Sequence, residues 1–440
     1  MRAVPAVTGV LLGGAAATVG IPGFLPGLPV RPWQLLAALA FALAITTARR
    51  RGVTRPRILV MDWLFVAFVL LTVVVEAFNS RDLGTGFDLS VVVYPLYPLV
   101  GYSAARFTVR HRTDAVVLFR WFALPVVPSG LAAVAQHVSD RLGRVVLNIA
   151  PSPNLEALVA KDDSVRATAF VGNWIGAGMY FSAALAAVCC VVVGTPKTRR
   201  IGVSVWVAGV SSIVGAVATA TISVFVMTVF ILGTTVIVGR GRALRFVGSA
   251  GSVAAVVAFV VTRRAVESRV EQQTALPYSD EAAETVEATT GTTWRLPSTL
   301  AYRVDVWTEQ TLPAIGSRPW TGWGAGVLES PARPAMLIWG SAESEWFAVA
   351  LWFGLPMAAF FVVVLGAIGV FLWRSRSSVS APIMAMFVAG LISAFIVPAF
   401  HNEGLPVAFW ALLGVVVSLH ASRPAGAEGR TRATVVRSDL

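Results

Sequence analysis

Five residues of this chain have side chains suited to chemistry, and each stands close to an apolar run. Arg166 and Arg303 carry guanidinium groups, whose planar fork binds phosphate oxygens with two hydrogen bonds and stays charged. Glu343 and Glu345 are carboxylates, which can accept a proton from an attacking hydroxyl group as general bases. His401 is a competing candidate base. If the fold brings these residues together, they form a site that can bind an anion and accept a proton.

Each of these residues also has a purely structural interpretation. Arg303 can extend its charged head to a lipid phosphate, and Arg166 can anchor an apolar run at the membrane interface. A carboxylate at the start of a helix is favoured by the helix dipole, which accounts for Glu343 or Glu345 without any catalysis. His401 is also typical of a residue at a membrane interface. The elements around these residues must therefore decide between the two interpretations.

One candidate element is a short amphipathic helix that carries Arg303. Four residues fall on one helical stripe at i, i+4, i+7 and i+11, namely Leu300, Val304, Trp307 and Thr311. Arg303 lies at the edge of this stripe, so a helix lying on the membrane would place it at the level of the lipid headgroups.

A glycine-rich stretch, Pro319-Trp-Thr-Gly-Trp-Gly-Ala-Gly326, follows that helix. Gly322, Gly324 and Gly326 permit a tight turn with positive φ or a close approach of two backbones. The stretch is not a nucleotide-binding loop, because no strand and helix flank it and no Lys-Ser/Thr follows.

The composition assigns these residues to a membrane protein. The 440 residues are 56% hydrophobic and 13% charged, whereas soluble globular chains average roughly 45–50% apolar and about 25% charged residues. This excludes a soluble enzyme and a disordered chain, and two cysteines exclude a disulfide-rich secreted module. Cys189 and Cys190 are adjacent in an apolar run, without the spacing of a metal site. No metal and no cofactor are predicted.

Uncharged or nearly uncharged runs are long enough to span a bilayer, which needs about 20 apolar residues. They occupy residues 3–30, 32–48, 58–75, 89–105, 115–136, 171–196, 201–239, 246–262, 346–373, 377–402 and 404–422. As one helix, 201–239 would measure about 58 Å, against a hydrocarbon core of about 30 Å. A hairpin turning near Thr219–Ser223 is therefore predicted, and the total is twelve spans in an all-α membrane protein.

Basic residues predict the orientation of these spans. They cluster after the even-numbered spans, at 49–57, 106–112, 197–200, 240–245, 374–376 and 423–437. The positive-inside rule places those loops and both termini in the cytoplasm. The net charge of +12 is thus explained by membrane topology, and no nucleic-acid partner is expected.

Four regions follow from this topology. Residues 1–262 form spans 1–9, residues 263–345 a large extracytoplasmic loop, residues 346–420 spans 10–12, and residues 421–440 a disordered cytoplasmic tail. Within the large loop, 263–276 is predicted to extend span 9 as a helix, and 277–293 is acidic and aromatic-poor. Most polar chemistry is therefore expected at the outer boundary of the membrane.

At this point the chain resembles the O-antigen ligase and O-antigen polymerase family, whose members are polytopic bacterial glycosyltransferases. Twelve spans with a large outer loop before the last three are one likeness. Arg166, followed by Gly172-Asn173 at the opening of a span, is similar to the family's Arg…Asn-Pro segment, with Trp174 in place of proline. Further likenesses are Arg303-x-x-x-Trp307 before the glycine-rich stretch, and Leu351-Trp-Phe-Gly354-Leu355 in the following span.

The resemblance implies a GT-C-like fold in the bacterial cytoplasmic membrane, with the active site facing outside. It implies transfer of a glycan from a polyprenyl-pyrophosphate donor to an acceptor hydroxyl on a glycan or glycolipid, without a metal. Arg166 and Arg303 would then bind the pyrophosphate. The supporting residues would be Asn173, Trp307, Gly324 and Gly326. A flippase or a chain-length regulator would be a partner in the assembly of cell-envelope polysaccharide.

Two departures affect the assignment of the base. Where family ligases carry a His-Asn pair, this chain has Glu343-Ser344, and its His-Asn pair is His401-Asn402. Where the family often has Ser-Arg in the eighth span, Ser223 is followed by Val224. Either Glu343 replaces the histidine, or His401 reaches the site from another hairpin, or activity is lost. A secondary transporter and a non-catalytic membrane scaffold are the alternative functions.

Overall fold

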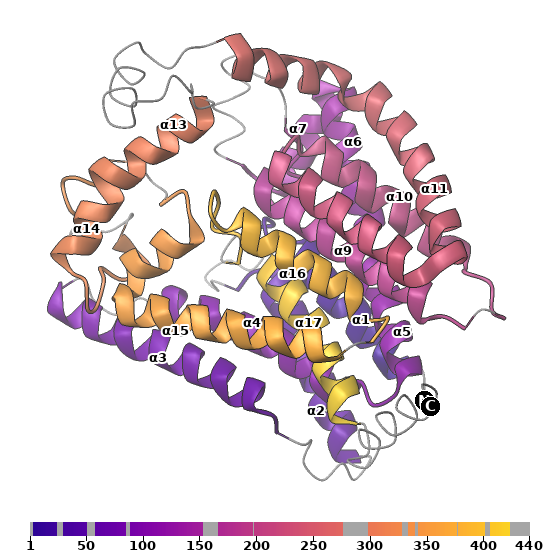
Figure 1. Ribbon diagram of the computed structural model, residues 1–440, viewed down its shortest axis with the longest axis horizontal. Coiled ribbons are helices and arrows are strands. Elements are labelled where there is room, and N and C mark those ends of the chain that lie inside the picture. Colours follow the sequence, from indigo (N-terminus) through magenta and orange to yellow (C-terminus); the bar gives the residue numbers. More distant parts are fainter. Residues whose placement is uncertain are drawn as a thin grey trace, which may run out of the picture.

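The computed structural model describes residues 3–23, 30–50, 58–84, 89–152, 166–196, 198–275, 298–327, 333–338, 342–375, 377–400 and 405–422. These residues form helices and connecting segments, with no strand among them, which confirms the all-α prediction for this part of the chain (Figure 1). His401 and residues 277–293 lie outside the described residues. The same is true of 423–440, which include most of the predicted tail.

The first half of the chain supplies seven of the labelled helices. They are α1 (Ala3–Ala17), α2 (Pro32–Arg50), α3 (Val60–Asp82), α4 (Leu89–Thr108), α5 (Arg112–Ala123), α6 (Val126–Val138) and α7 (Asp140–Ile149). The second half supplies α9 (Trp174–Gly194), α10 (Val203–Ala218), α11 (Ile222–Ala275), α13 (Ser298–Asp305), the π-helical turn η1 (Val306–Thr311), α14 (Leu312–Ser317), α15 (Glu345–Ser375), α16 (Ala381–Ser393) and α17 (Leu405–Ala421).

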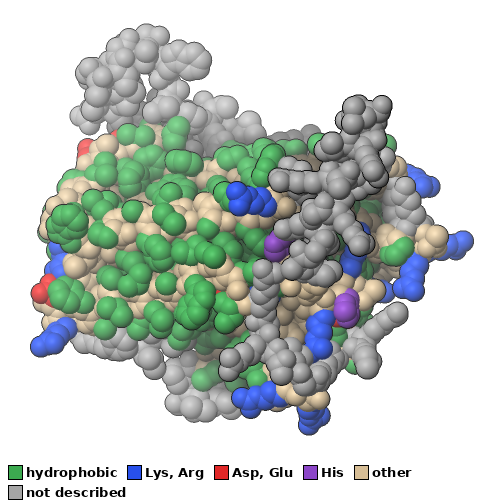
Figure 2. Space-filling view, turned by 60° about the horizontal axis from the view of Figure 1, so that its bottom comes forward, with side chains coloured by type: hydrophobic (Ala, Val, Ile, Leu, Met, Phe, Trp, Pro, Cys, Tyr) green, Lys and Arg blue, Asp and Glu red, His purple; other side chains and the backbone are tan. Residues whose placement is uncertain are grey.

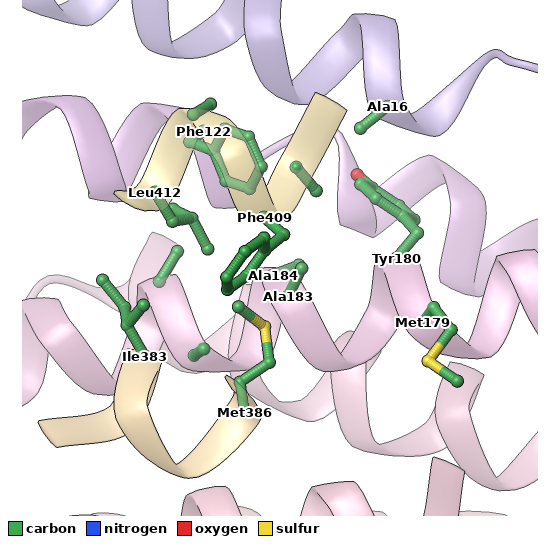
Figure 3. Packing of buried hydrophobic residues seen from close by; sticks show 14 of the residues in the cluster. Ala16, Phe122, Met179, Tyr180, Ala183, Ala184, Ile383, Met386, Phe409 and Leu412 are labelled. Atoms are coloured by element: carbon green, nitrogen blue, oxygen red, sulfur yellow. The ribbon is translucent and has the colours of Figure 1, made fainter. Parts of the chain in front are cut away.

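Helix α9 forms the centre of the assembly. Nearly all of its residues are buried, because Gly, Ala and Ser along it allow neighbouring helices to approach closely. Figure 3 shows Tyr180, Ala183 and Ala184 of α9 packed against hydrophobic side chains from the surrounding helices. Among these neighbours are Phe122 of α5, Ile383 and Met386 of α16, and Phe409 and Leu412 of α17.

Five described helical stretches are long and apolar enough to cross a membrane. They are Val60–Asp82, Arg112–Val138, Trp174–Gly194, Ile222–Gly239 and Glu345–Ser375. Shorter apolar helices occupy Ala3–Ala17, Val203–Ala218, Ala381–Ser393 and Pro406–Ala421. The fold is therefore that of a helical membrane protein, whereas the number of twelve spans stays a prediction.

The segment 201–275 agrees with the prediction at one point and differs at another. The predicted turn near Thr219–Ser223 is confirmed, because α10 ends at Ala218, α11 begins at Ile222 and Ala220 adopts a φ of 47°. Helix α11 then continues through 240–245, where a loop between two spans was predicted, and it reaches Ala275. Arginine, alanine and leucine in 240–245 are good helix formers, and no proline interrupts them. Figure 1 shows this long helix bending around one side of the assembly.

Contacts between chain segments define two opposite ends of the helix assembly. At the end that we call the basic end, Arg112 donates hydrogen bonds to Val193 O and Ser378 Oγ, and Ser418 Oγ donates to Arg106 O. At the other end, which we call the loop end, Gly20 N donates to Phe170 O and Ala167 N donates to Ala218 O. The start of α15 and the end of α16 also meet there, since Glu345 N donates to Ala394 O.

The surface between the two ends suits a lipid environment. Figure 2 shows a face covered by hydrophobic side chains, with Lys and Arg gathered toward its right-hand side. Helix α3 contributes large exposed side chains to the hydrophobic surface, among them Val74 and Phe78. This distribution agrees with a membrane protein whose polar residues are concentrated at its ends.

We predict that Gly13 of α1 is required for close packing against α5. A Cβ atom at Gly13 would lie 2.1 Å from Phe122 O, and overpacking of a tight contact typically costs about 1–3 kcal/mol of unfolding free energy. Gly13→Ala should lower the thermal unfolding midpoint of the purified protein in detergent. The matched control is Gly233→Ala in α11, where nothing lies within 4 Å of the added atom. Equal midpoints for the two variants would contradict the α1–α5 packing.

Candidate functional site

Arg303 and Trp307 lie on one helical stretch at the loop end. The predicted helix is confirmed, and it runs from Ser298 through the π-helical turn η1 to Ser317. In that turn Thr311 Oγ1 donates a hydrogen bond to Val306 O at 3.1 Å. Such turns are frequent at functional sites because they shift the register of side chains along a helix. Here the turn lies between Arg303 and the glycine-rich stretch.

Arg303 and Glu343 form an ion pair. Arg303 Nη2 lies 3.2 Å from Glu343 Oε2, and the exposed fractions of the two side chains are 20% and 18%. Arg303 Nε also donates a hydrogen bond of 2.9 Å to Ile396 O, just beyond α16. The pair therefore joins the stretch Ser298–Ser317 to the ends of two apolar helices, in a partly buried position that solvent still reaches.

The backbone around Glu343 is held on both sides. Glu343 adopts a φ of 50°, an unusual conformation for a residue with a side chain. Before it, Ala342 O accepts a hydrogen bond of 3.0 Å from Trp307 Nε1. After it, Ser344 Oγ donates to Ala394 O at 3.2 Å. Trp307 therefore supports Glu343 directly, and the surrounding contacts maintain the strained conformation that aims Glu343 at Arg303.

Glu345 has a different environment from Glu343. It is fully buried, and its Oε2 accepts a hydrogen bond of 2.9 Å from Phe400 N. The carboxylate therefore anchors the segment between α16 and α17 to the start of α15. Its burial favours Glu343 over Glu345 as the base that meets a substrate. His401 follows Phe400 directly, but its side chain lies outside the described residues.

Arg166 belongs to a second polar cluster at the loop end. Its guanidinium carbon lies 5.1 Å from the centroid of the Trp174 ring, a cation–π contact. Asn173 caps α9, because its side-chain oxygen accepts hydrogen bonds from Ile175 N and Gly176 N. The 166–173 loop is held from α6, where Gln136 Oε1 accepts from Thr168 N and Ala169 N. Joint binding of one diphosphate by Arg166 and Arg303 stays a prediction.

A break in α15 adds an element that was not predicted. Gly354 has non-helical dihedrals, φ 82° and ψ 168°, and Pro356 has no N–H to donate. The carbonyl groups of Leu351 and Trp352 therefore lose their usual partners within the helix. They accept hydrogen bonds of 2.9 Å from Trp323 N and Gly324 N, respectively.

The segment Arg318–Ala325, which we call the inserted segment, fills this break. Its Pro319 O accepts a hydrogen bond of 2.7 Å from Leu355 N. Gly322 and Gly324 have φ values of 67° and 86°, and a Cβ at Gly322 would lie 2.5 Å from the carbonyl carbon of Trp352. The predicted close backbone approach is thus confirmed at these two glycines. Gly326 directly follows the inserted segment and is partly buried.

Three side chains of α3 bind the inserted segment, and the sequence analysis did not single them out. Asp82 Oδ2 lies 2.6 Å from Arg318 Nη2, Asn79 Nδ2 donates to Thr321 O at 2.7 Å, and Glu76 Oε2 accepts from Ala325 N at 3.0 Å. Their spacing of three residues, which places polar groups on one helix face beyond the apolar run 58–75, is the signal that could have identified them.

The sequence comparisons give no relative for this chain. No protein-family model matches it, and no curated protein matches it. The fold and the site define a helical membrane protein with a polar cluster, centred on Arg303 and Glu343, at its loop end. Its likeness to the O-antigen ligase and polymerase family rests on the sequence motifs, and the activity that it implies is a proposal.

We predict that Glu345 contributes to stability as a hydrogen-bond acceptor. Glu345→Ala leaves the buried Phe400 N–H without its acceptor, which should cost about 1–3 kcal/mol of unfolding free energy. Glu345→Gln keeps an acceptor oxygen and should lose much less. Thermal unfolding of both variants in detergent checks this. An Ala variant as stable as the wild type would show that Glu345 is not an anchor.

Proposed function

We propose that this protein is a glycosyltransferase that uses a polyprenyl-pyrophosphate-linked glycan as donor and a hydroxyl of a glycan or glycolipid as acceptor. In this proposal it works in the bacterial cytoplasmic membrane, with the loop end facing outside. The observation that carries the proposal is the ion pair of Arg303 and Glu343, partly exposed at the mouth of an apolar helix. The two side chains are 20% and 18% exposed, so a substrate can reach both charges, which suit the binding of an anion and the acceptance of a proton.

The pair supplies the two groups that glycosyl transfer needs. The bond between sugar C1 and the pyrophosphate oxygen breaks, and the acceptor oxygen forms a new bond to C1. The departing pyrophosphate takes the bonding electrons, and the guanidinium of Arg303 stabilises its negative charge. The acceptor hydroxyl gives its proton to the carboxylate of Glu343. Arginine thus takes the role that a metal ion has in other transferases.

Donor binding also frees the proposed base. In the structure Arg303 Nη2 contacts Glu343 Oε2 at 3.2 Å. A diphosphate presents several anionic oxygens and competes with the carboxylate for the same guanidinium. When Arg303 turns toward the phosphate, Glu343 is released for the acceptor hydroxyl. Arg166, beside Trp174, is the second cation of the proposal and would contact the other phosphate group.

A secondary transporter is the second candidate, and the break in α15 is the observation that favours it. Transporters often bind ions and substrates at discontinuous helices, through carbonyl groups freed by the break. In this chain Trp323 N and Gly324 N already bind the freed carbonyls of Leu351 and Trp352. The break therefore serves to attach the inserted segment, which supports the transferase over the transporter.

We predict that Arg303→Ala and Glu343→Gln abolish glycan transfer while expression stays normal. A strain lacking the protein would be complemented with the wild type or a variant, and its lipid-linked glycans and surface polysaccharide would be extracted together. The variants should accumulate short polyprenyl-linked oligosaccharides and lose surface polymer. The chain lengths of the products would distinguish a polymerase from a ligase.

Two matched controls use exposed residues with the same charges. Arg81→Ala on α3 and Glu309→Gln on η1 should leave surface polysaccharide unchanged. Glu345→Gln should also retain transfer, since its acceptor oxygen remains. If the deletion strain has normal lipid-linked glycans and surface polymer, the transferase proposal fails, and transport assays would then test the second candidate.

A further inference from the structure

Two members of the polar row of α3 (Glu76, Asn79 and Asp82) are buried, whereas apolar residues of the same helix are exposed. Glu76 and Asn79 are 6% and 1% exposed, whereas Val74 and Phe78 on the same helix are 62% and 54% exposed. Ionisable and polar groups in such a helix are costly and usually functional. The polar face therefore needs an explanation beyond membrane insertion.

The contacts of the row have a regular register. Going down α3 from Asp82 through Asn79 to Glu76, the partners go up the inserted segment from Arg318 through Thr321 to Ala325. The inserted segment therefore lies antiparallel along α3. Asn79 is central in this arrangement, because its Nδ2 is also 3.4 Å from Trp352 O at the break of α15. One amide group thus connects α3 with both the inserted segment and α15.

The side-chain oxygen of Asn79, Oδ1, is buried without a hydrogen bond within the described part of the chain, which costs free energy that an apolar side chain would not cost. An unsatisfied polar atom in a buried place needs an explanation. The amide is explained if the donor function of Nδ2 matters more than satisfaction of the oxygen.

We call the place where α3, the inserted segment and the break in α15 meet the junction. Two chain segments, which we call arms, connect this junction with the Arg303–Glu343 pair. The first arm is the helical stretch Ser298–Ser317, which carries Arg303 and leads directly into the inserted segment. The second arm is the beginning of α15, from Glu345 to the break at Gly354, and Glu343 stands just before it. The arms are joined near the ion pair by Trp307 and Ala342, and at the junction by Trp323 and Leu351.

Side chains between the arms form a small core of their own. Its members come from both arms and from the chain between them, and they include Ala314, Ile315, Leu337, Ala348 and Leu351. Trp307 and Phe347 add a ring contact with centroids 5.4 Å apart. The arms are thus packed together, and their side chains form a continuous path of contacts between the inserted segment and the ion pair.

We propose that Asn79, assisted by Glu76, is a positioning residue for the Arg303–Glu343 site. It fixes the inserted segment in the break of α15, and the two arms then hold the guanidinium and the carboxylate at the distance that the reaction requires. As far as activity is concerned, this inference rests on the proposed function. Its structural part stands independently, because it concerns the relative placement of two arms.

The kinetic test compares variants of neighbouring buried residues. A small misplacement of reacting groups can cost about 10²-fold in rate, so Asn79→Ala should lower kcat about 10²-fold and change KM little. Asn79→Gln keeps the amide donor and should recover part of the rate. The matched control is Ser80→Ala, because Ser80 is 5% exposed and donates only within its own helix, to Ala77 O. Its kcat should equal that of the wild type.

A second measurement does not require activity. Spin labels would be attached to Thr308→Cys on the first arm and to Phe395→Cys, both exposed positions. The second label reports on the second arm, because the neighbouring Ala394 O accepts a hydrogen bond from Glu345 N. The native Cys189 and Cys190 are fully buried, which protects them from labelling. Electron paramagnetic resonance should give one narrow distance distribution for the labelled protein that keeps Asn79, and the same for its Ser80→Ala variant. The Asn79→Ala variant should give a broadened distribution.

The outcomes separate the positioning role from the proposed reaction. A broadened distribution in Asn79→Ala supports the inference, even if the wild type shows no glycan transfer, in which case the proposed function alone fails. An unchanged distribution in a folded Asn79→Ala protein overturns the inference. If that variant does not fold, Glu76→Ala replaces it in the same comparison. Glu76→Gln is then the conservative variant.

Discussion

The structure depends on one requirement, which is that every backbone polar group within a membrane must find a partner. In α15 the sequence Gly354-Leu-Pro356 interrupts the helix and leaves the carbonyl groups of Leu351 and Trp352 without intrahelical donors. The inserted segment, Arg318–Ala325, supplies two of its N–H groups to them. Because this pairing is made by backbone atoms, it fixes the inserted segment to α15 in one register.

That attachment explains how the stretch Ser298–Ser317 comes to share a polar site with the start of α15. The inserted segment is attached to α3 and α15, which lie side by side through Phe68 and Phe361 (Figure 1). From this fixed point the helical stretch Ser298–Ser317 and the beginning of α15 extend together toward Arg303 and Glu343. The break is thus part of the arrangement that places a cation and a carboxylate where the apolar helices end.

The sequence predicted the features that follow from local patterns. Apolar runs located the helices, a helical stripe located Arg303 and Trp307, and the glycine spacing indicated the close approach at Gly322 and Gly324. The break in α15 was missed because Gly354 and Pro356 lie inside an apolar run, and their hydrogen-bond partners are about 30 residues away. The continuity of α11 was missed because its arginine cluster resembles a cytoplasmic loop. The pairing of Arg303 with Glu343 depends on tertiary structure, which no local pattern encodes.

The central claim is that the loop end transfers a glycan from a polyprenyl pyrophosphate. Its most direct test is the purified wild-type protein in proteoliposomes, supplied with a polyprenyl-pyrophosphate-linked oligosaccharide from the host strain and an acceptor glycolipid or glycan. The account predicts stoichiometric release of polyprenyl pyrophosphate as the acceptor gains the glycan, with no release by Glu343→Gln. Equal release by wild type and Glu343→Gln, or no release by folded wild-type protein with either acceptor, would contradict it.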